Sequence, residues 1–598
     1  MFYFIKKKLF LLVLFVSHFA FTQNSELALS YFKNGEYEKA IIIYKPLLNK
    51  EPFQRVYFKN LLISYQQTEE FGMANDLIRN QMKRFPNQVA LNIELGYNYD
   101  LQGQEEKAKI YYDIALKYIE QNPKFVFAIC QVFKKNYLLD YALNGYKIAK
   151  TQDPKLNTEI SEAQIYGEKS DLKNMFSSYL DLIEKDEKYY PSIQRYIATY
   201  ITEDQHNETN VLFKKLLLKR AQNNPNDSWN ILLSWLFMQQ REYSKSLVQE
   251  KSLYKRKHES LDRIIEVGVV SFENKDLETS YNAFNFILNN TKDPDIILQA
   301  QIYLLQIALD RASDKKELNE IDKNFQSLFE NYGKNSATIN LQVAYADFLA
   351  FSYHEPEKAI DLLNEATTMA NSKFQKGKIQ IKLADILVYT NQFNQALILY
   401  SQVQSSLKNS AIAQTARFKV AQTSYFKGDF KWAQTQLKVL KSSTSQLIAN
   451  DALDLNLLIT NNIENDSVHD ALKNYAAAEL LAFQKNTSKA IDTLGVLLTK
   501  YKGHPIEDEA LFKKAELYTA NQNYSKAEAN YLKIIEIDAL GVMVDDSYYM
   551  LAELYAVHLD DSEKAKEMYQ KIIFEYPSSI YLVDARKKFR VLRGDKIP

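Results

Sequence analysis

The sequence predicts an all-α protein, an α-α superhelix of roughly 12–14 helical hairpins stacked along the chain. Two observations lead to this fold class. The 598 residues include only 14 glycines and 12 prolines, well below average usage of about 7% and 5%, and these residue types punctuate strands and tight loops. A small residue also recurs at a fixed spacing, which indicates a repeat array and not one large core.

The first array, predicted over residues 23–156, has a period of 34 residues. An alanine marks each repeat, followed four residues later by Tyr or Ile on the same face of a helix. We expect this alanine to lie where the second helix of a hairpin crosses the first, with Gly96 as a small residue on the other side. Gly35, Gly72 and Gly103 are expected at the turns between the two helices. The marker residues are Ala40, Ala74, Ala108 and Ala142.

A second array is predicted over residues 336–598, with a period near 37 residues. Its alanines are separated by 37, 37, 57, 37 and 38 residues, and the long step leaves room for one additional helix around Gln446–Thr460. Pro356 suits the first turn of a helix. The marker residues are Ala359, Ala396, Ala433, Ala490, Ala527 and Ala565.

Between the two arrays, residues 157–335 are predicted to form divergent helical hairpins. Ser246 and Ser280 take the place of the alanine and again lie 34 residues apart, while Gly268 fits the small position of a first helix. No clean register is found over residues 166–207. The chain therefore divides into two regular arrays that flank a degenerate one.

The combination of fixed period, alanine, aromatic residue and proline in residues 21–156 resembles the tetratricopeptide repeat family. Residues 470–592 are similar to repeats of bacterial envelope proteins, namely outer-membrane-assembly lipoproteins and periplasmic proteins that coordinate the Tol–Pal system. That similarity rests on Tyr569, the run Phe574-Glu575-Tyr576-Pro577-Ser578-Ser579 and Asp584-Ala585-Arg586. It implies a tetratricopeptide-repeat solenoid that binds other proteins in a groove lined by the first helix of each hairpin.

The first 22 residues are predicted to be a cleaved signal peptide. Lys6, Lys7 and Lys8 form a basic start, and the apolar run that follows ends at Phe21, short of the ~20 residues that span a bilayer. Ala20 and Thr22 stand at −3 and −1 of a cleavage point before Gln23, and an uncleaved anchor is the alternative. No cysteine lies at the cleavage point, which separates this chain from the lipoproteins. No later segment is apolar enough to span a membrane, so we expect an exported protein, periplasmic or peripherally associated with the outer membrane.

Charge and cysteine usage narrow the function further. Lys+Arg and Asp+Glu both number 74, so the formal net charge is zero. Proteins that bind nucleic acid usually carry an excess of positive charge, which this sequence does not have. The single cysteine, Cys130, cannot form an internal disulfide and is expected to be a small core residue.

The candidate binding site is a stripe of acidic and aromatic residues in the second array. Ala-Glu-Leu recurs at 478–480, 515–517 and 552–554. The alanine is expected to pack on the neighbouring helix, so the next residue points about 100° away, toward the groove. An aromatic residue precedes each triplet by one turn, and Asp385 occupies the acidic position of an earlier repeat. The acidic-aromatic stripe comprises Tyr475, Glu479, Phe512, Glu516, Tyr549, Glu553 and Asp385.

Two interpretations of this stripe stay open. In the first, it is a solvated helix face whose aromatic residues pack between repeats. In the second, it is a groove for a partly basic, partly apolar segment, because aromatic rings supply contact area and buried carboxylates select cationic partners.

No nucleotide-binding, metalloprotease or serine-hydrolase motif occurs in the sequence. His504 with Glu507, Asp508 and Glu509 fits a solvated loop and a helix N-terminus better than a metal site. We therefore predict no catalytic residues, metal or cofactor, and other proteins as partners. The predicted function is an interaction scaffold of the bacterial envelope. A binding subunit or regulator of one exported client is the alternative, an enzyme with an unrecognised site in 157–335 is a third, and self-association stays open.

Overall fold

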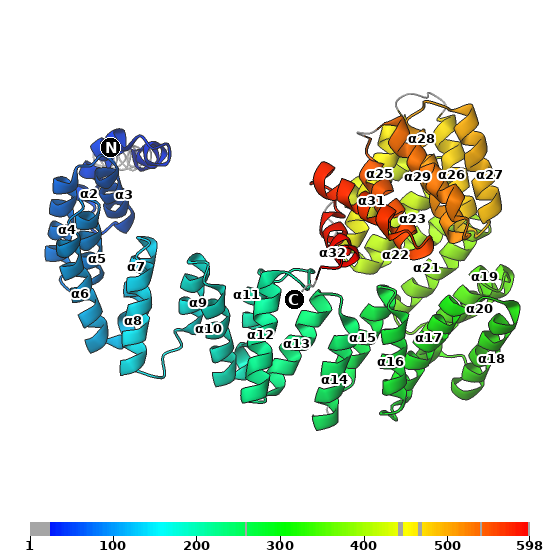
Figure 1. The fold of residues 1–598 in the computed structure, drawn as a ribbon, viewed down its shortest axis with the longest axis horizontal. Helices are drawn as coiled ribbons and strands as arrows, with labels where there is room; N and C mark the ends of the chain where they lie inside the picture. Colours follow the sequence, from blue (N-terminus) through cyan, green and yellow to red (C-terminus); the bar gives the residue numbers. More distant parts are fainter. Residues whose placement is uncertain (1–23, 258–259, 441–445, 464–468, 539–540, 596–598) are drawn as a thin grey trace, which may run out of the picture. The chain divides into compact units, whose positions relative to one another are not determined.

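The computed structural model describes residues 24–257, 260–440, 446–463, 469–538 and 541–595. These residues form helices and connecting turns without any strand, and within hairpins such as α5–α6, α21–α22 or α28–α29 one helix packs on the next (Figure 1). The predicted all-α fold of stacked helical hairpins is confirmed. The predicted signal peptide, 1–22, lies outside the described residues.

The described chain divides into two compact units. The N-terminal unit contains residues up to Ile201 together with Val211–Trp229. It begins with a helix over 24–33. The elements that follow are α2 (Tyr37–Lys50), α3 (Arg55–Gln67), α4 (Phe71–Arg84), α5 (Ala90–Asp100), α6 (Glu105–Gln121), η1 (Pro123–Phe125), α7 (Val126–Lys135), α8 (Leu139–Gln152), α9 (Glu159–Glu168), α10 (Leu172–Lys185), η2 (Glu187–Tyr189), α11 (Tyr190–Ala198) and most of α12 (Glu208–Asn223).

The C-terminal unit contains Thr202–Asn210 and the chain from Asn230 onward. Its elements are most of α13 (Asp227–Gln239), α14 (Tyr243–Lys257), α15 (Asp262–Glu273), α16 (Leu277–Leu288), α17 (Pro294–Arg311), α18 (Lys315–Tyr332), η3 (Ser336–Thr338), α19 (Ile339–Phe351), α20 (Pro356–Met369), α21 (Lys373–Tyr389), α22 (Phe393–Ser406), α23 (Ala411–Phe426), α24 (Phe430–Leu440), α25 (Gln446–Ile463), α26 (Asp470–Phe483), α27 (Thr487–Lys500), α28 (Ile506–Ala520), α29 (Tyr524–Ile537), α30 (Val544–Glu553), η4 (Leu554–His558), α31 (Ser562–Glu575) and α32 (Leu582–Arg593).

Two details of the second array follow the sequence closely. The long step between repeat alanines accommodates the additional helix α25, which begins at Gln446 as predicted. Pro356 is the first residue of α20, where its missing N–H costs no helical hydrogen bond. The division into 23–156, 157–335 and 336–598 stays a prediction.

The repeat alanines lie where the hairpins are most crowded. Each of them is fully buried, in both arrays. In the degenerate region Ser246 and Ser280 are also fully buried, and each hydroxyl has a partner: Ser246 bonds to Ser234 at 2.8 Å, and Ser280 donates to the backbone oxygen of Gly268 at 2.8 Å. Serine therefore replaces alanine at the helix crossing because its one polar atom is satisfied there.

Glycine is required at one crossing of the first array. A Cβ added to Gly96 on α5 would lie 2.5 Å from Cε1 of Tyr112 on α6 and 3.0 Å from the backbone oxygen of Ala108. Cys130 has a similar place on α7: it is fully buried, as predicted, and donates to the backbone oxygen of Ala142 at 3.4 Å.

The turns inside the hairpins depend less on glycine than predicted. Gly35 and Gly103 occupy left-handed turn positions, but Gly72 lies inside α4, and Glu69 takes the left-handed position before it at φ 59°. The next residue, Glu70, donates from its N–H to the backbone oxygen of Tyr65 at 2.8 Å, which closes the turn. The prediction for Gly72 was wrong because this hydrogen bond holds the turn without glycine.

Gly96 and Gly72 make a matched pair for a stability measurement. Gly96→Ala is expected to lower the free energy of unfolding by about 1–3 kcal/mol, because the new methyl group must displace Tyr112. Gly72→Ala places its methyl group in open space on a helix, so stability is expected to stay or to rise by about 0.5–1 kcal/mol. Urea unfolding followed by circular dichroism measures both changes. If both substitutions change the free energy of unfolding equally, the close approach of Tyr112 to Gly96 does not limit the residue at that position.

Candidate functional site

The predicted site lies on the first helices of the hairpins in the C-terminal unit. We call the face formed by α17, α19, α21, α23, α26, α28, α30 and the terminal α32 the A-helix face. Along it α19 packs on α21, α21 on α23, α23 on α26 and α26 on α28, so residues from neighbouring repeats meet there.

Glu479 shares a hydrogen bond with a buried tyrosine of the preceding repeat. The Tyr425 hydroxyl on α23 donates to Oε2 of this half-buried carboxylate at 2.7 Å. Burial raises the pKa of Glu479, while the Tyr425 hydrogen bond and the charge of Lys513 act in the opposite direction. The carboxylate is thus a link between repeats as well as part of the stripe.

Asp385 has the same kind of surroundings two hairpins earlier. The Tyr400 hydroxyl on α22 donates to its Oδ1 at 2.5 Å, and Nζ of Lys419 on α23 lies 3.3 Å from the same oxygen. The Asp385 side chain is only 12% exposed. A carboxylate this buried needs such partners, because an unpaired buried charge is costly.

Glu553 repeats the arrangement near the end of the chain. It accepts a hydrogen bond from Tyr569 on α31 and forms an ion pair with Lys588 on α32, with 2.7 Å between Nζ and Oε1. Nζ of Lys588 also donates to the Tyr549 hydroxyl at 2.9 Å. The Tyr549 hydroxyl in turn donates to Oδ2 of Asp584 at 2.5 Å.

A lysine about one repeat period further along accompanies most of the acidic positions. Asp347 on α19 pairs with Lys382 on α21 in the same way as Asp385 with Lys419 and Glu553 with Lys588. Glu516 departs from the rule, because it pairs with a lysine of its own helix at 3.0 Å. We call these lysines the ladder lysines: Lys382, Lys419, Lys513 and Lys588.

The sequence analysis missed the ladder lysines, although a signal was present. Asp347 with Lys382, Asp385 with Lys419 and Glu553 with Lys588 are each separated by nearly the spacing of the repeat alanines, so opposite charges one period apart in the sequence indicate these three pairs. Their presence means that the acidic positions are partly neutralised within the chain.

Two aromatic members of the stripe, Tyr475 and Tyr549, pack between repeats, and Phe512 packs inside its own hairpin. Tyr475 is 5% exposed, and its hydroxyl donates to the backbone oxygen of Glu509 at 3.4 Å. Half-buried Phe512 meets Tyr531 edge-on with 5.4 Å between ring centroids, and Tyr549 stacks on Tyr581 at 4.1 Å. Among the carboxylates, the side chains of Glu516 and Glu553 are 40% and 28% exposed, against 12% for Asp385.

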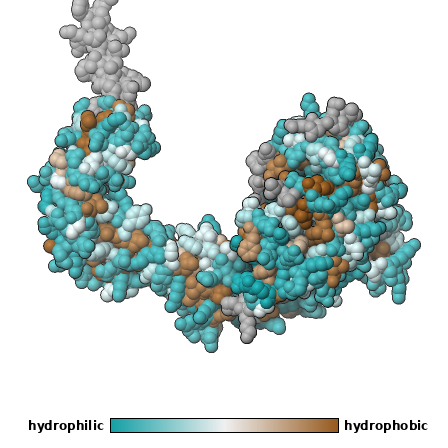
Figure 2. Space-filling model, turned by 45° about the horizontal axis from the view of Figure 1, so that its top comes forward, coloured by the Kyte–Doolittle hydropathy of each residue, from teal (hydrophilic) through white to brown (hydrophobic). Residues whose placement is uncertain are grey.

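A cavity of about 700 Å³ opens on the A-helix face where α17, η3, α19 and α21 meet. Its lining is mainly polar, with Gln299 and Gln306 from α17, Asn340 from α19 and Lys378 from α21, and it reaches the Asp347–Lys382 pair. Such a volume falls within the range of about 300–1,000 Å³ that is usual for ligand sites. Hydrophilic residues predominate on the face visible in Figure 2, with separate apolar areas.

Metal binding and membrane insertion find no support in the described residues. Among the described residues, no cluster of three or more His, Cys, Asp or Glu side chains could hold a metal ion. Within the same part of the chain, no helix is long and apolar enough to cross a membrane. Glu507, Asp508 and Glu509 lie in the first turn of α28, where the helix dipole stabilises negative side chains.

The hairpins and their crossing alanines define the class of protein as a tetratricopeptide-like helical solenoid. Residues 508–539 and 546–579 each match a family model described as "Tetratricopeptide repeat". The C-terminal part of the chain therefore contains tetratricopeptide repeats, and these include Phe512, Glu516, Tyr549 and Glu553.

Two solved structures match the chain at low sequence identity. A chain from the "Structure of Naa15/Naa10 bound to HypK-THB" is 14% identical, with 89% of this chain and 86% of that chain covered and a TM-score of 0.31. A chain from the "Crystal structure of APC/C hetero-tetramer Cut9-Hcn1" is 13% identical, with 91% and 98% covered and a TM-score of 0.23. No curated protein sequence matches the chain.

Proposed function

We propose that this protein is a non-catalytic interaction scaffold that binds a segment of a partner protein on the A-helix face of the C-terminal unit. The observation that supports this most is the continuity of the face: the carboxylates, the ladder lysines and the polar cavity lie on successive first helices. Tetratricopeptide repeats at 508–539 and 546–579 agree with a protein partner.

The ladder lysines refine the chemistry of the partner. Because Asp385 and Glu553 already have cationic neighbours, a purely basic segment gains little from them. Glu516 is more accessible, since its side chain is 40% exposed. The best partner is a segment that combines a few cationic side chains with backbone and amide groups, which the Gln and Asn residues of the cavity can bond.

We also propose that the scaffold works in the bacterial envelope, in the periplasm or at the outer membrane. The support is the basic and apolar pattern of residues 1–22 and the similarity of 470–592 to envelope repeat proteins. N-terminal sequencing of the protein from fractionated cells is expected to start at Gln23 in the envelope fraction. An intact N-terminus in the cytoplasmic fraction would contradict export.

Neutralising the stripe tests the scaffold proposal. Glu479, Glu516 and Glu553 are changed together to Gln, and partners captured after crosslinking in cells are compared with those of wild type. The control triple changes Glu536, Glu563 and Glu567, exposed carboxylates of the second helices α29 and α31, and so removes the same charge.

We expect the stripe triple to lose its main partner at least about tenfold and the control triple to retain it, since each lost charge-assisted contact costs about 1.5–3 kcal/mol. Crosslinks of the wild type should map to α26, α28 and α30. If both triple variants retain the partner equally, or lose it equally, the A-helix face is not the binding surface.

A further inference from the structure

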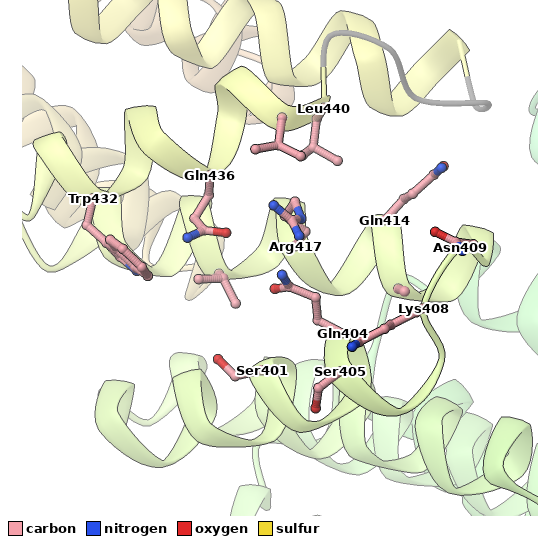
Figure 3. A pocket seen from close by; sticks show the side chains of 13 residues that line it. Ser401, Gln404, Ser405, Lys408, Asn409, Gln414, Arg417, Trp432, Gln436 and Leu440 are labelled. Carbon is pink, nitrogen blue, oxygen red and sulfur yellow. The ribbon is translucent and has the colours of Figure 1, made fainter. Parts of the chain in front are cut away.

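A second cavity, of about 560 Å³, lies away from the A-helix face, between the second helices α22 and α24 and the outer side of α23. Figure 3 shows Arg417 of α23 near its centre, between Gln404 on α22 and Gln436 on α24, with Trp432 toward one end. The proposed function does not involve this cavity.

The cavity is cationic. Arg417 and Lys408 contribute two positive charges to its lining, and no Asp or Glu is among its described lining residues. Among the described residues, the partner found for Arg417 is neutral: with the Gln404 amide oxygen turned toward the guanidinium, that oxygen accepts from Nε at 3.3 Å and from Nη2 at 2.7 Å. A guanidinium has five N–H donors, so it retains capacity for a carboxylate.

One buried acceptor in the lining is unsatisfied. Gln436 is 8% exposed, and its Oε1 has no hydrogen-bond partner. Leaving such a group unpaired is unfavourable, so a donor from a bound molecule would strengthen binding there. Because Gln436 lies beside Arg417, the bound molecule must present a donor close to its negative charge.

An apolar wall completes the site. Trp432 is 48% exposed and Val439 is 55% exposed, while Leu440 beside them is buried. Of the three tryptophans in the chain, Trp229 is fully buried and Trp235 is half-buried, so Trp432 is the most accessible. Exposed tryptophan beside a desolvated polar group is typical of residues that dominate binding energy at protein interfaces.

From these three features we infer that the cavity binds an acidic-apolar segment of a partner protein, in which an apolar side chain is followed by two acidic ones. The acidic side chains pair with Arg417 and Lys408, the apolar one packs on Trp432, and a backbone N–H of the segment donates to Oε1 of Gln436. This charge preference is opposite to that of the stripe, so the two surfaces select different partners.

A defined peptide tests the inference on the full chain. Acetyl-Ala-Leu-Glu-Glu-Ala-amide is titrated while tryptophan fluorescence and heat of binding are recorded, and it is expected to bind saturably and to change the Trp432 emission. The peptide with both Glu replaced by Gln is expected to bind at least about tenfold more weakly. Absence of saturable binding up to about 5 mM, which corresponds to roughly 3 kcal/mol, would overturn the inference.

Two double variants locate the site. Arg417→Gln with Lys408→Gln is expected to weaken peptide binding at least about tenfold. The control, Lys431→Gln with Lys438→Gln, removes the same charge from exposed positions of α24 outside the lining and should leave binding unchanged. If the control weakens peptide binding as much as the Arg417 and Lys408 double variant does, the peptide binds through the net charge of the protein and not through the cavity.

Gln436→Leu separates binding from folding. Loss of the unpaired acceptor should leave the melting temperature unchanged or raise it, while peptide affinity falls about threefold to tenfold. Unchanged affinity would remove Gln436 from the site. A chain-end peptide, acetyl-Ala-Gln-Leu with a free carboxylate, is a further arm: tighter binding of that peptide would overturn the internal acidic segment as the partner. The stripe triple variant keeps this cavity, so failure here is distinguishable from failure of the scaffold proposal.

Discussion

Tyr569→Ala is expected to destabilise the last repeats by about 3–5 kcal/mol. Tyr569 is fully buried in the core shared by α30, α31 and α32, and loss of a buried aromatic side chain leaves a cavity as well as lost apolar burial. The substitution also removes the hydroxyl that donates to Glu553. Urea unfolding with hydrogen exchange resolved by peptide measures the effect.

The damage from Tyr569→Ala should stay local. In a repeat array each hairpin packs mainly on its neighbours, so amides of α30–α32 are expected to lose protection first and those of α19–α22 to change little. Tyr569→Phe is the control. It keeps the ring, and Glu553 keeps Lys588, so the expected cost is about 0.5–1.5 kcal/mol. A Phe variant as unstable as the Ala variant would show that the hydroxyl, and not packing, dominates.

The repeat framework could be predicted from the sequence because its physical requirements fall on single positions. A small residue, most often an alanine such as Ala527 or Ala565, lets two helices cross closely, and it recurs at the period of the fold. The additional helix α25 was predictable for the same reason, since a step of 57 residues is too long for one hairpin.

The turns and the details of the site were harder to predict. The turn before α4 holds its left-handed residue with a backbone hydrogen bond, and backbone hydrogen bonds leave no mark on residue type. The stripe was predicted as a set of positions on one face, but the partners Tyr425, Lys419 and Lys588 come from other helices. Such partners depend on how neighbouring repeats pack, which single-helix geometry does not contain.

The cationic cavity had no sequence signature. Lys408, Arg417 and Gln436 lie on or beside three different helices and show no common spacing. What distinguishes them is the lack of an acidic neighbour and the burial of Gln436, both of which are properties of the packed structure.

Lys588→Glu is expected to lower the free energy of unfolding at pH 7 by about 1–3 kcal/mol. The new carboxylate would face Glu553 and Asp584, which now lie 2.7 Å and 2.9 Å from the lysine nitrogen. Removing one partner of a buried pair costs about 3–5 kcal/mol, and the value expected here is smaller because the Lys588 side chain is 36% exposed and solvent screens it.

The pH dependence identifies charge as the cause. Although burial acts in the opposite direction, the hydrogen bonds to Glu553, Tyr549 and Asp584 raise the pKa of Lys588 above its ordinary value. Burial also acts to raise the pKa of Asp584, but hydrogen bonds from Tyr549 and Lys588 lower it overall. A carboxyl group with a lowered folded pKa stabilises the protein above its unfolded pKa, about 3.9 for Asp, and that contribution is lost as the pH falls through the folded value.

The difference between wild type and Lys588→Glu should therefore narrow as the pH falls from 7 toward about 4, where the clustered carboxylates of the variant take up protons and the repulsion disappears. Lys588→Gln removes the charge without reversing it and should lie between the two at pH 7. Urea unfolding at several pH values measures all three proteins. A difference in unfolding free energy that stays constant with pH would mean that Lys588 acts through the packing of its aliphatic stem on Tyr549. The ladder lysines would then stabilise the contacts between repeats by packing more than by neutralising the carboxylates of the stripe.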